Sequence, residues 1–182
     1  MHINYQLTKQ DYIDFNIFHM SYSNTIRQAL FIQRYIISIV FLIAPFIVAK
    51  VTDIPLWYWA IAFIVIYLLW IIFYPKYFRW SAARRISRMI DEGKNADMLG
   101  NQSLTLTEDA IVNISNFSES KTNWHTVENV VETKEHIFIY ISAVMAYIIP
   151  IRIFESVNQK NEFSCTLNYF TDKNNAKNKA ES

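Results

Sequence analysis

Few residues in this chain have the types and spacings that carry out chemistry. The four histidines are His2, His19, His125 and His136, and none pairs with another histidine, a cysteine or a carboxylate at a spacing that defines a metal site. Zinc and similar metals need such spacings to assemble a coordination shell. His125 follows Trp124 on an expected strand, where it fits the rim of a fold. The sequence therefore predicts no metal site.

The carboxylates and glycines also argue against catalysis. Glu132 and Glu135 flank an expected hairpin, and the sequence offers no partner that would make either a general acid or base. The only two glycines are Gly93 and Gly100, so the glycine-rich loops that hold phosphates and dinucleotides are absent. A GxSxG nucleophile turn is absent as well. We therefore predict no cofactor and expect a protein that is not an enzyme.

A cluster of basic residues is the main candidate for binding. Its members are Lys76, Arg79, Arg84, Arg85 and Arg88. Apolar residues recur among them at helical spacing, which predicts a helix from residue 75 to about residue 92 near the membrane surface. Each cation close to anionic lipid contributes about 1 kcal/mol, so these five are candidate contacts for anionic headgroups. A simple topology signal would explain the same residues, and their place beside an apolar segment argues against nucleic acid.

Two apolar stretches before this cluster predict a membrane hairpin. Residues 54–74 carry no charge, and about 20 apolar residues cross the ~30 Å hydrocarbon core as a helix. Residues 35–49 are also uncharged, and they reach spanning length if Arg34 and Lys50 extend toward the headgroups. Pro45 is expected to kink this first helix. The short loop at residues 52–55 makes the two helices antiparallel.

The distribution of cations predicts which side each end faces. Arg27 and Arg34 precede the first span, the basic cluster follows the second, and the loop has only Lys50 beside Asp53. The positive-inside rule then places both termini in the cytoplasm, in a multi-pass protein of the plasma membrane. A re-entrant hairpin and a buried soluble hairpin are the alternatives. The single Cys165 forms no intrachain disulfide, which fits a cytosolic face.

The second half of the chain predicts short strands followed by a helix. Runs rich in β-branched and aromatic residues recur from residue 102, with a turn at residues 108–109. The uncharged residues 137–151 are interrupted and closed by Pro150, which favours a hairpin of buried strands over a third crossing. A helix beginning near Ser156 has an apolar face of Phe163, Leu167 and Phe170. The polar residues after Asp172 are expected to be disordered.

The N-terminal residues are expected to join this sheet. Ile3, Tyr5 and Leu7 alternate with polar residues as in a half-buried strand, and Thr8 with Asp11 has helix-capping spacing. The expected parts of the chain are an N-terminal strand and helix, a transmembrane hairpin, a basic helix with its linker, a cytosolic domain and a tail. The strand and helix occupy residues 1–30, the hairpin residues 31–75, and the basic helix with its linker residues 76–100. The cytosolic domain occupies residues 101–171 and the tail residues 172–182.

The order of these segments resembles a known family. A TKQDYIDF segment, two apolar spans and a basic stretch precede LTEDAIV, NWHTVENVVET, HIFIYIS and AYIIPIRIF. This arrangement resembles the YcxB-like family of small bacterial membrane proteins. The resemblance implies an α+β fold with a PH-like (pleckstrin-homology-like) antiparallel barrel or sheet capped by a C-terminal helix, and no established enzymatic activity. The family commonly has a basic residue where this chain has Ile151, with Arg152 next.

Three functional hypotheses follow. The first is a non-enzymatic, membrane-anchored module whose cytosolic domain binds a protein segment, a lipid headgroup or another copy of the chain. Trp124, His125 and Arg152 are its candidate contact surface, with a core position as the alternative for Trp124. The second is an accessory subunit that packs into a larger complex through small residues of the hairpin. The third is an enzyme, which a polar pocket around a strongly perturbed titratable group would favour.

Overall fold

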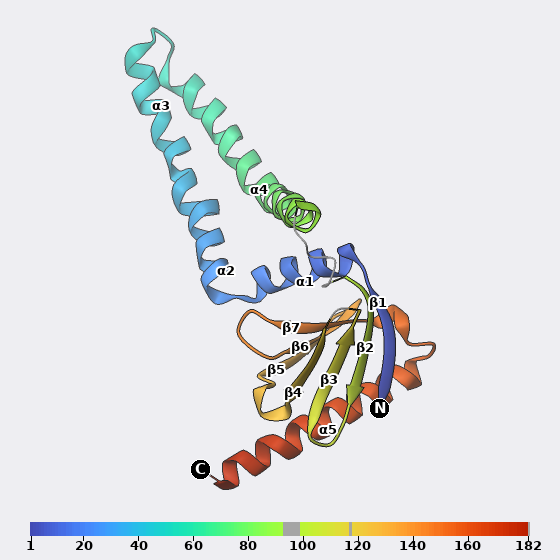
Figure 1. Cartoon of the computed structure of the whole chain (residues 1–182). Helices are drawn as coiled ribbons and strands as arrows, with labels where there is room; N and C mark the ends of the chain where they lie inside the picture. Colours follow the sequence, from blue (N-terminus) through green and yellow to red (C-terminus); the bar gives the residue numbers. More distant parts are fainter. Residues whose placement is uncertain (93–98, 117, 182) are drawn as a thin grey trace. The chain divides into compact units, whose positions relative to one another are not determined.

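The computed structural model describes residues 1–92, 99–116 and 118–181, and it divides into two compact units (Figure 1). The sheet unit consists of Met1–Phe15 and Ser87–Ser182, and the helical unit consists of Asn16–Ile86. The expected segments 1–30 and 76–100 are therefore each divided between the units. The expected linker falls mostly at residues 93–98, outside the described residues.

The sheet unit contains two antiparallel sheets. The first has the order β1 (His2–Leu7), β2 (Gly100–Leu106), β3 (Ala110–Ser115) and β4 (Glu119–Asn123). The second has the order β5 (Asn129–Glu132), β6 (His136–Tyr140) and β7 (Ala146–Pro150). Together with the apolar helices and a C-terminal helix, they confirm the α+β class.

The two sheets do not close into a barrel, which corrects that part of the prediction. A 3-10 turn at Trp124–Thr126 separates β4 from β5, so Trp124 does not lie on the strand expected for it. Among the described residues, no strand pairing joins the sheets. Side chains connect them instead, because the Tyr147 hydroxyl lies 2.7 Å from Thr122 Oγ1 and 3.2 Å from Ser120 Oγ.

The N-terminal strand pairs with the rest of the sheet as predicted. β1 runs antiparallel to β2, with Ile3 opposite Leu104 and Tyr5 opposite Gln102. Ile3, Tyr5 and Leu7 are buried, whereas the residues between them are exposed. The alternation therefore places one face of the strand in the core.

The uncharged stretch at residues 137–151 folds as the predicted hairpin. β6 and β7 are antiparallel neighbours, with Ile137 opposite Ile149 and Ile139 opposite Tyr147. Every residue of β6 is buried. A third membrane crossing is therefore wrong for this stretch.

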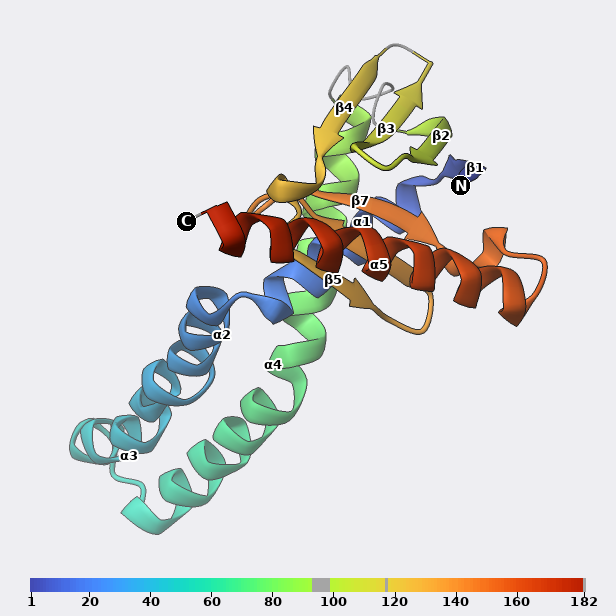
Figure 2. The ribbon, with the colours of Figure 1, turned by 90° about the horizontal axis from the view of Figure 1, so that it is seen from below.

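The C-terminal helix α5 (Val157–Glu181) completes the core of the sheet unit (Figure 2). Phe163 and Leu167 are fully buried, and the ring of Phe170 lies 5.3 Å from that of Trp124. The predicted apolar face is confirmed. α5 extends to Glu181, and the disordered tail expected at residues 172–182 stays a prediction. Alanine, lysine and glutamate in this segment favour helix, and it contains no glycine or proline.

The helical unit is built from two long apolar helical segments. The first consists of α2 (Asn24–Phe31), a π-helical turn (Ile32–Ile36), a 3-10 turn (Ile37–Ile39) and α3 (Val40–Val51). The second is α4 (Leu56–Glu92), whose most apolar stretch has a mean hydropathy of 2.3 and no buried residue. Both segments are long and apolar enough to cross a membrane. α4 continues through Pro75, so the span and the basic helix are one element.

Candidate functional site

The basic cluster of α4 is exposed, as binding to an external anion requires. All five cations, Lys76, Arg79, Arg84, Arg85 and Arg88, have exposed side chains. Among the described residues, none of them forms an ion pair. The Arg84 guanidinium lies 4.0 Å from the centre of the Trp80 ring, which holds that cation against an aromatic face. Within the described part of the chain these cations are therefore open to external anions.

Trp124, His125 and Arg152 do not form the continuous contact surface expected of them. Trp124 is only 1% exposed, and its indole Nε1–H donates to the Thr107 carbonyl at 2.9 Å. Its place between a sheet and α5 makes it a core residue, which corrects the surface role. His125 is exposed on the same 3-10 turn. Arg152 is engaged elsewhere, by Asp11.

Asp11 is the centre of a buried polar cluster that the sequence did not indicate. Its side chain is 2% exposed, and its carboxylate accepts hydrogen bonds from Arg152 Nη1 at 2.5 Å, Arg152 Nη2 at 2.6 Å and His136 Nε2 at 2.8 Å. The backbone N–H and hydroxyl of Thr8 each donate to Oδ2 at 2.7 Å. Arg152 Nη2 also donates to the Gln6 carbonyl at 3.1 Å. The cluster ties the start of α1 (Lys9–Tyr22) to β6 and to the 3-10 turn Ile151–Ile153.

The electrostatics of this cluster favour a charged carboxylate. Burial by itself would raise the pKa of Asp11, but the hydrogen bonds from Arg152, Thr8 and His136 outweigh it and hold that pKa well below its usual range. The bond to Asp11 raises the pKa of Arg152 further. Burial, with the nearby Tyr147 and Asp11, raises the pKa of Tyr5. With five donors around it, Asp11 has little capacity left to bind a substrate.

Three side chains at the edge of this cluster carry ligand atoms suited to a cation. Asp14, Glu135 and His136 place one such atom each within 4.8 Å of one another. His136 has one nitrogen bonded to Asp11, which leaves one ring nitrogen to contribute. The sequence separates Asp14 from the other two by more than a hundred positions, so its spacing gave no sign of the group. Exposed carboxylates gather without a metal in many proteins, and we assign none here.

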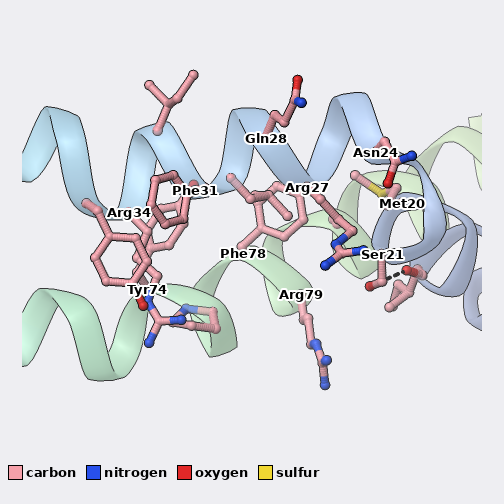
Figure 3. A pocket seen from close by; sticks show the side chains of 16 residues that line it. Met20, Ser21, Asn24, Arg27, Gln28, Phe31, Arg34, Tyr74, Phe78 and Arg79 are labelled. Carbon is pink, nitrogen blue, oxygen red and sulfur yellow. Dashed lines mark hydrogen bonds between the residues drawn. The ribbon is translucent and has the colours of Figure 1, made fainter.

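The helical unit contains a pocket of about 880 Å³ between α2 and α4 (Figure 3). Three arginines line it, Arg27 and Arg34 from the first segment and Arg79 from α4. Figure 3 shows Arg27 reaching from α2 toward α4 beside Phe78, whereas Arg79 extends from α4 away from α2. Only Arg79 of these three belongs to the predicted basic cluster. From the sequence, Arg27 and Arg34 indicate topology, and Arg34 is also expected to extend toward the headgroups.

These features define a class of protein: an α+β chain with two apolar helices packed together, two antiparallel sheets and a C-terminal helix. Residues 106–164 of the chain match the YcxB-like protein family, and the predicted resemblance is confirmed over this segment. The matched segment runs from the end of β2 into α5 and includes Trp124, His136 and Arg152. Searches of curated proteins and of solved structures returned no match.

Proposed function

We propose that this protein is a non-enzymatic binding or assembly module held at the cytoplasmic face of a membrane. The apolar helical segments anchor it, the basic cluster of α4 contacts anionic headgroups, and the sheet unit presents a folded surface to a protein partner or a second copy. The observation that carries the proposal is the continuity of α4, whose apolar half leads without a break into five exposed cations that form no ion pair among the described residues.

The exposed side chains of the apolar segments support the anchor. Large apolar residues such as Phe46, Ile47 and Trp57 are more than half exposed. Exposing so much apolar area to water is costly, whereas lipid tails cover it without penalty. A membrane is the environment that fits this surface.

The Asp11 cluster supports a binding role over catalysis. Asp11 is the carboxylate whose pKa departs most from its ordinary value among the described residues. It is buried and fully hydrogen-bonded, so it fixes the start of α1 within the sheet unit and offers no open site for a reacting group. A structural clamp is the simpler role for it.

An accessory subunit that packs through the hairpin is the second candidate. Ala44, Ala49, Ala60 and Ala62 are partly covered within the helical unit. The surface left for another membrane helix is therefore built of larger apolar residues. The small residues therefore support packing of the two hairpin segments against each other more than packing against a partner helix.

The test is lipid selectivity of the full chain in proteoliposomes. Spin-labelled phosphatidylglycerol and phosphatidylcholine are compared for association with the wild type, and we expect a severalfold preference for the anionic lipid that falls as salt rises. The triple variant R84Q/R85Q/R88Q should lose most of this preference. The matched variant K121Q/K134Q/K173Q, which removes three exposed cations of the sheet unit, should keep it. Equal association of both lipids with the wild type would refute the headgroup contact.

A further inference from the structure

We infer that the pocket between α2 and α4 binds one anionic phospholipid, with the phosphate held by Arg34 and the hydroxyl of Tyr74 and attracted by the charge of Arg27, which lies nearer the start of the same helical segment (Figure 3). This inference rests on the proposed membrane location. It does not depend on the basic cluster that carries the proposed headgroup contact, except for Arg79, which belongs to both.

The charge of the pocket calls for an anion. Arg27, Arg34 and Arg79 line it, and its lining contains no acidic residue. In the described chain, none of the three forms an ion pair. The Nε of Arg34 donates to a backbone carbonyl and its guanidinium lies 5.0 Å from the centre of the Tyr35 ring, while its terminal nitrogens have no hydrogen bond among the described residues and can act as a fork. Guanidinium forks match the oxygens of a phosphate group in geometry and charge.

Tyr74 provides an independent sign that a polar ligand belongs here. Its side chain is 5% exposed and lines the pocket, and its buried hydroxyl has no hydrogen-bond partner among the described residues. A buried hydroxyl without a partner is unfavourable, and a phosphate oxygen would accept its proton. Figure 3 places Tyr74 at the same end of the pocket as Arg34.

The remainder of the lining suits the apolar part of a lipid. Phe31, Phe78, Ile17 and Leu30 are among its apolar lining residues, and the volume of about 880 Å³ exceeds the space that a free phosphate needs. The pocket is bounded by two helices that are long and apolar enough to cross a membrane. A phospholipid therefore matches both the charged end and the apolar wall.

Native mass spectrometry of the delipidated full chain in a nonionic detergent tests the inference. We expect one saturable molecule of phosphatidylglycerol per chain and at least roughly tenfold weaker binding of phosphatidylcholine with the same acyl chains. Arg27→Gln and Tyr74→Phe should each weaken phosphatidylglycerol binding severalfold. Arg27 is exposed and has no described partner, and Tyr74→Phe removes one oxygen atom, so neither change disturbs the fold.

The matched control is Arg84→Gln, which removes the same charge from α4 outside the pocket and should leave this site unchanged. Loss of the single lipid in Arg84→Gln to the same degree as in Arg27→Gln would overturn the inference. So would displacement of the lipid by millimolar inorganic phosphate, which would identify a site for free phosphate. A pocket that fails this test while the proteoliposomes still select anionic lipid would leave the proposed function intact.

Discussion

The side chain of Arg34 donates a hydrogen bond from Nε to the backbone carbonyl of Ile71, at 3.1 Å. In an α-helix that carbonyl accepts from the N–H four residues later, which here is Pro75. Proline has no N–H, so it leaves the Ile71 carbonyl without its usual donor. Arg34 supplies the missing donor from the other apolar segment. This explains how α4 continues through Pro75 and how the two segments are held in register.

This relationship predicts a coupling between two substitutions. Arg34→Met should lower the free energy of unfolding of the detergent-solubilised chain by about 1–3 kcal/mol, because the Ile71 carbonyl loses its donor. In the Pro75→Ala background the helix supplies its own N–H, and the same substitution should cost clearly less. A double-mutant cycle of thermal unfolding measures this coupling. Additive effects would contradict the role assigned to Arg34.

The Asp11 cluster predicts a specific dependence of stability on pH. The pKa of Asp11 is lower in the folded chain than in the unfolded one, so its contribution is complete above about pH 4, the usual carboxyl value, and falls as pH drops through the folded pKa. At pH 7 Asp11→Asn should cost about 3–5 kcal/mol, because Arg152 and His136 lose their anionic partner. That deficit relative to the wild type should shrink below about pH 4.

Thermal unfolding of the full chain from pH 7 to pH 3 measures this effect. Asp109→Asn is the matched control, since Asp109 is exposed between β2 and β3 and is not a member of the cluster. It should change stability little and leave the pH profile in place. A deficit for Asp11→Asn that stays constant across this pH range would show that its charge is unimportant.

Trp124 and His125 are neighbours with opposite expected responses to substitution. Trp124→Ala should destabilise the chain by about 3–5 kcal/mol, because it opens a cavity against α5 and leaves the Thr107 carbonyl without its indole donor. His125→Ala should change stability by about 0.5 kcal/mol or less, because that side chain is exposed. Chemical denaturation of both variants measures the contrast. Similar costs for the two would mean that Trp124 is not in the core.

Cys165 is the only cysteine and lies exposed on α5, so it reports the side on which the sheet unit stands. With cytoplasmic termini, a membrane-impermeant maleimide should leave Cys165 unlabelled in intact cells and label it after permeabilisation. The measurement is the mass shift of the purified chain. A variant carrying Asp53→Cys and Cys165→Ser, with its cysteine in the α3–α4 loop, should be labelled in intact cells. The reverse pattern would invert the proposed orientation.

The elements with local signals in the sequence were predictable. The alternation of Ile3, Tyr5 and Leu7 predicts a half-buried strand, and the structure pairs β1 with β2 in that way. The Thr8–Asp11 spacing predicts a helix start, and the Asp11 N–H bonds to Thr8 Oγ1 at 3.3 Å. Apolar periodicity and side-chain caps act over a few residues, and so a short window of sequence contains the whole cause.

The relationships that matter most for the site join residues far apart in the chain. Asp11 meets His136 and Arg152 across 125 and 141 positions, and Arg34 meets Ile71 across 37. As a residue type, Trp124 fits either a surface platform or a core position. Its packing against α5 places it in the core. Local pattern is enough to assign a helix or a strand, because backbone periodicity needs no distant partner. Which buried donor bonds to which buried acceptor depends on how the elements pack. These pairings therefore form only when the whole chain folds.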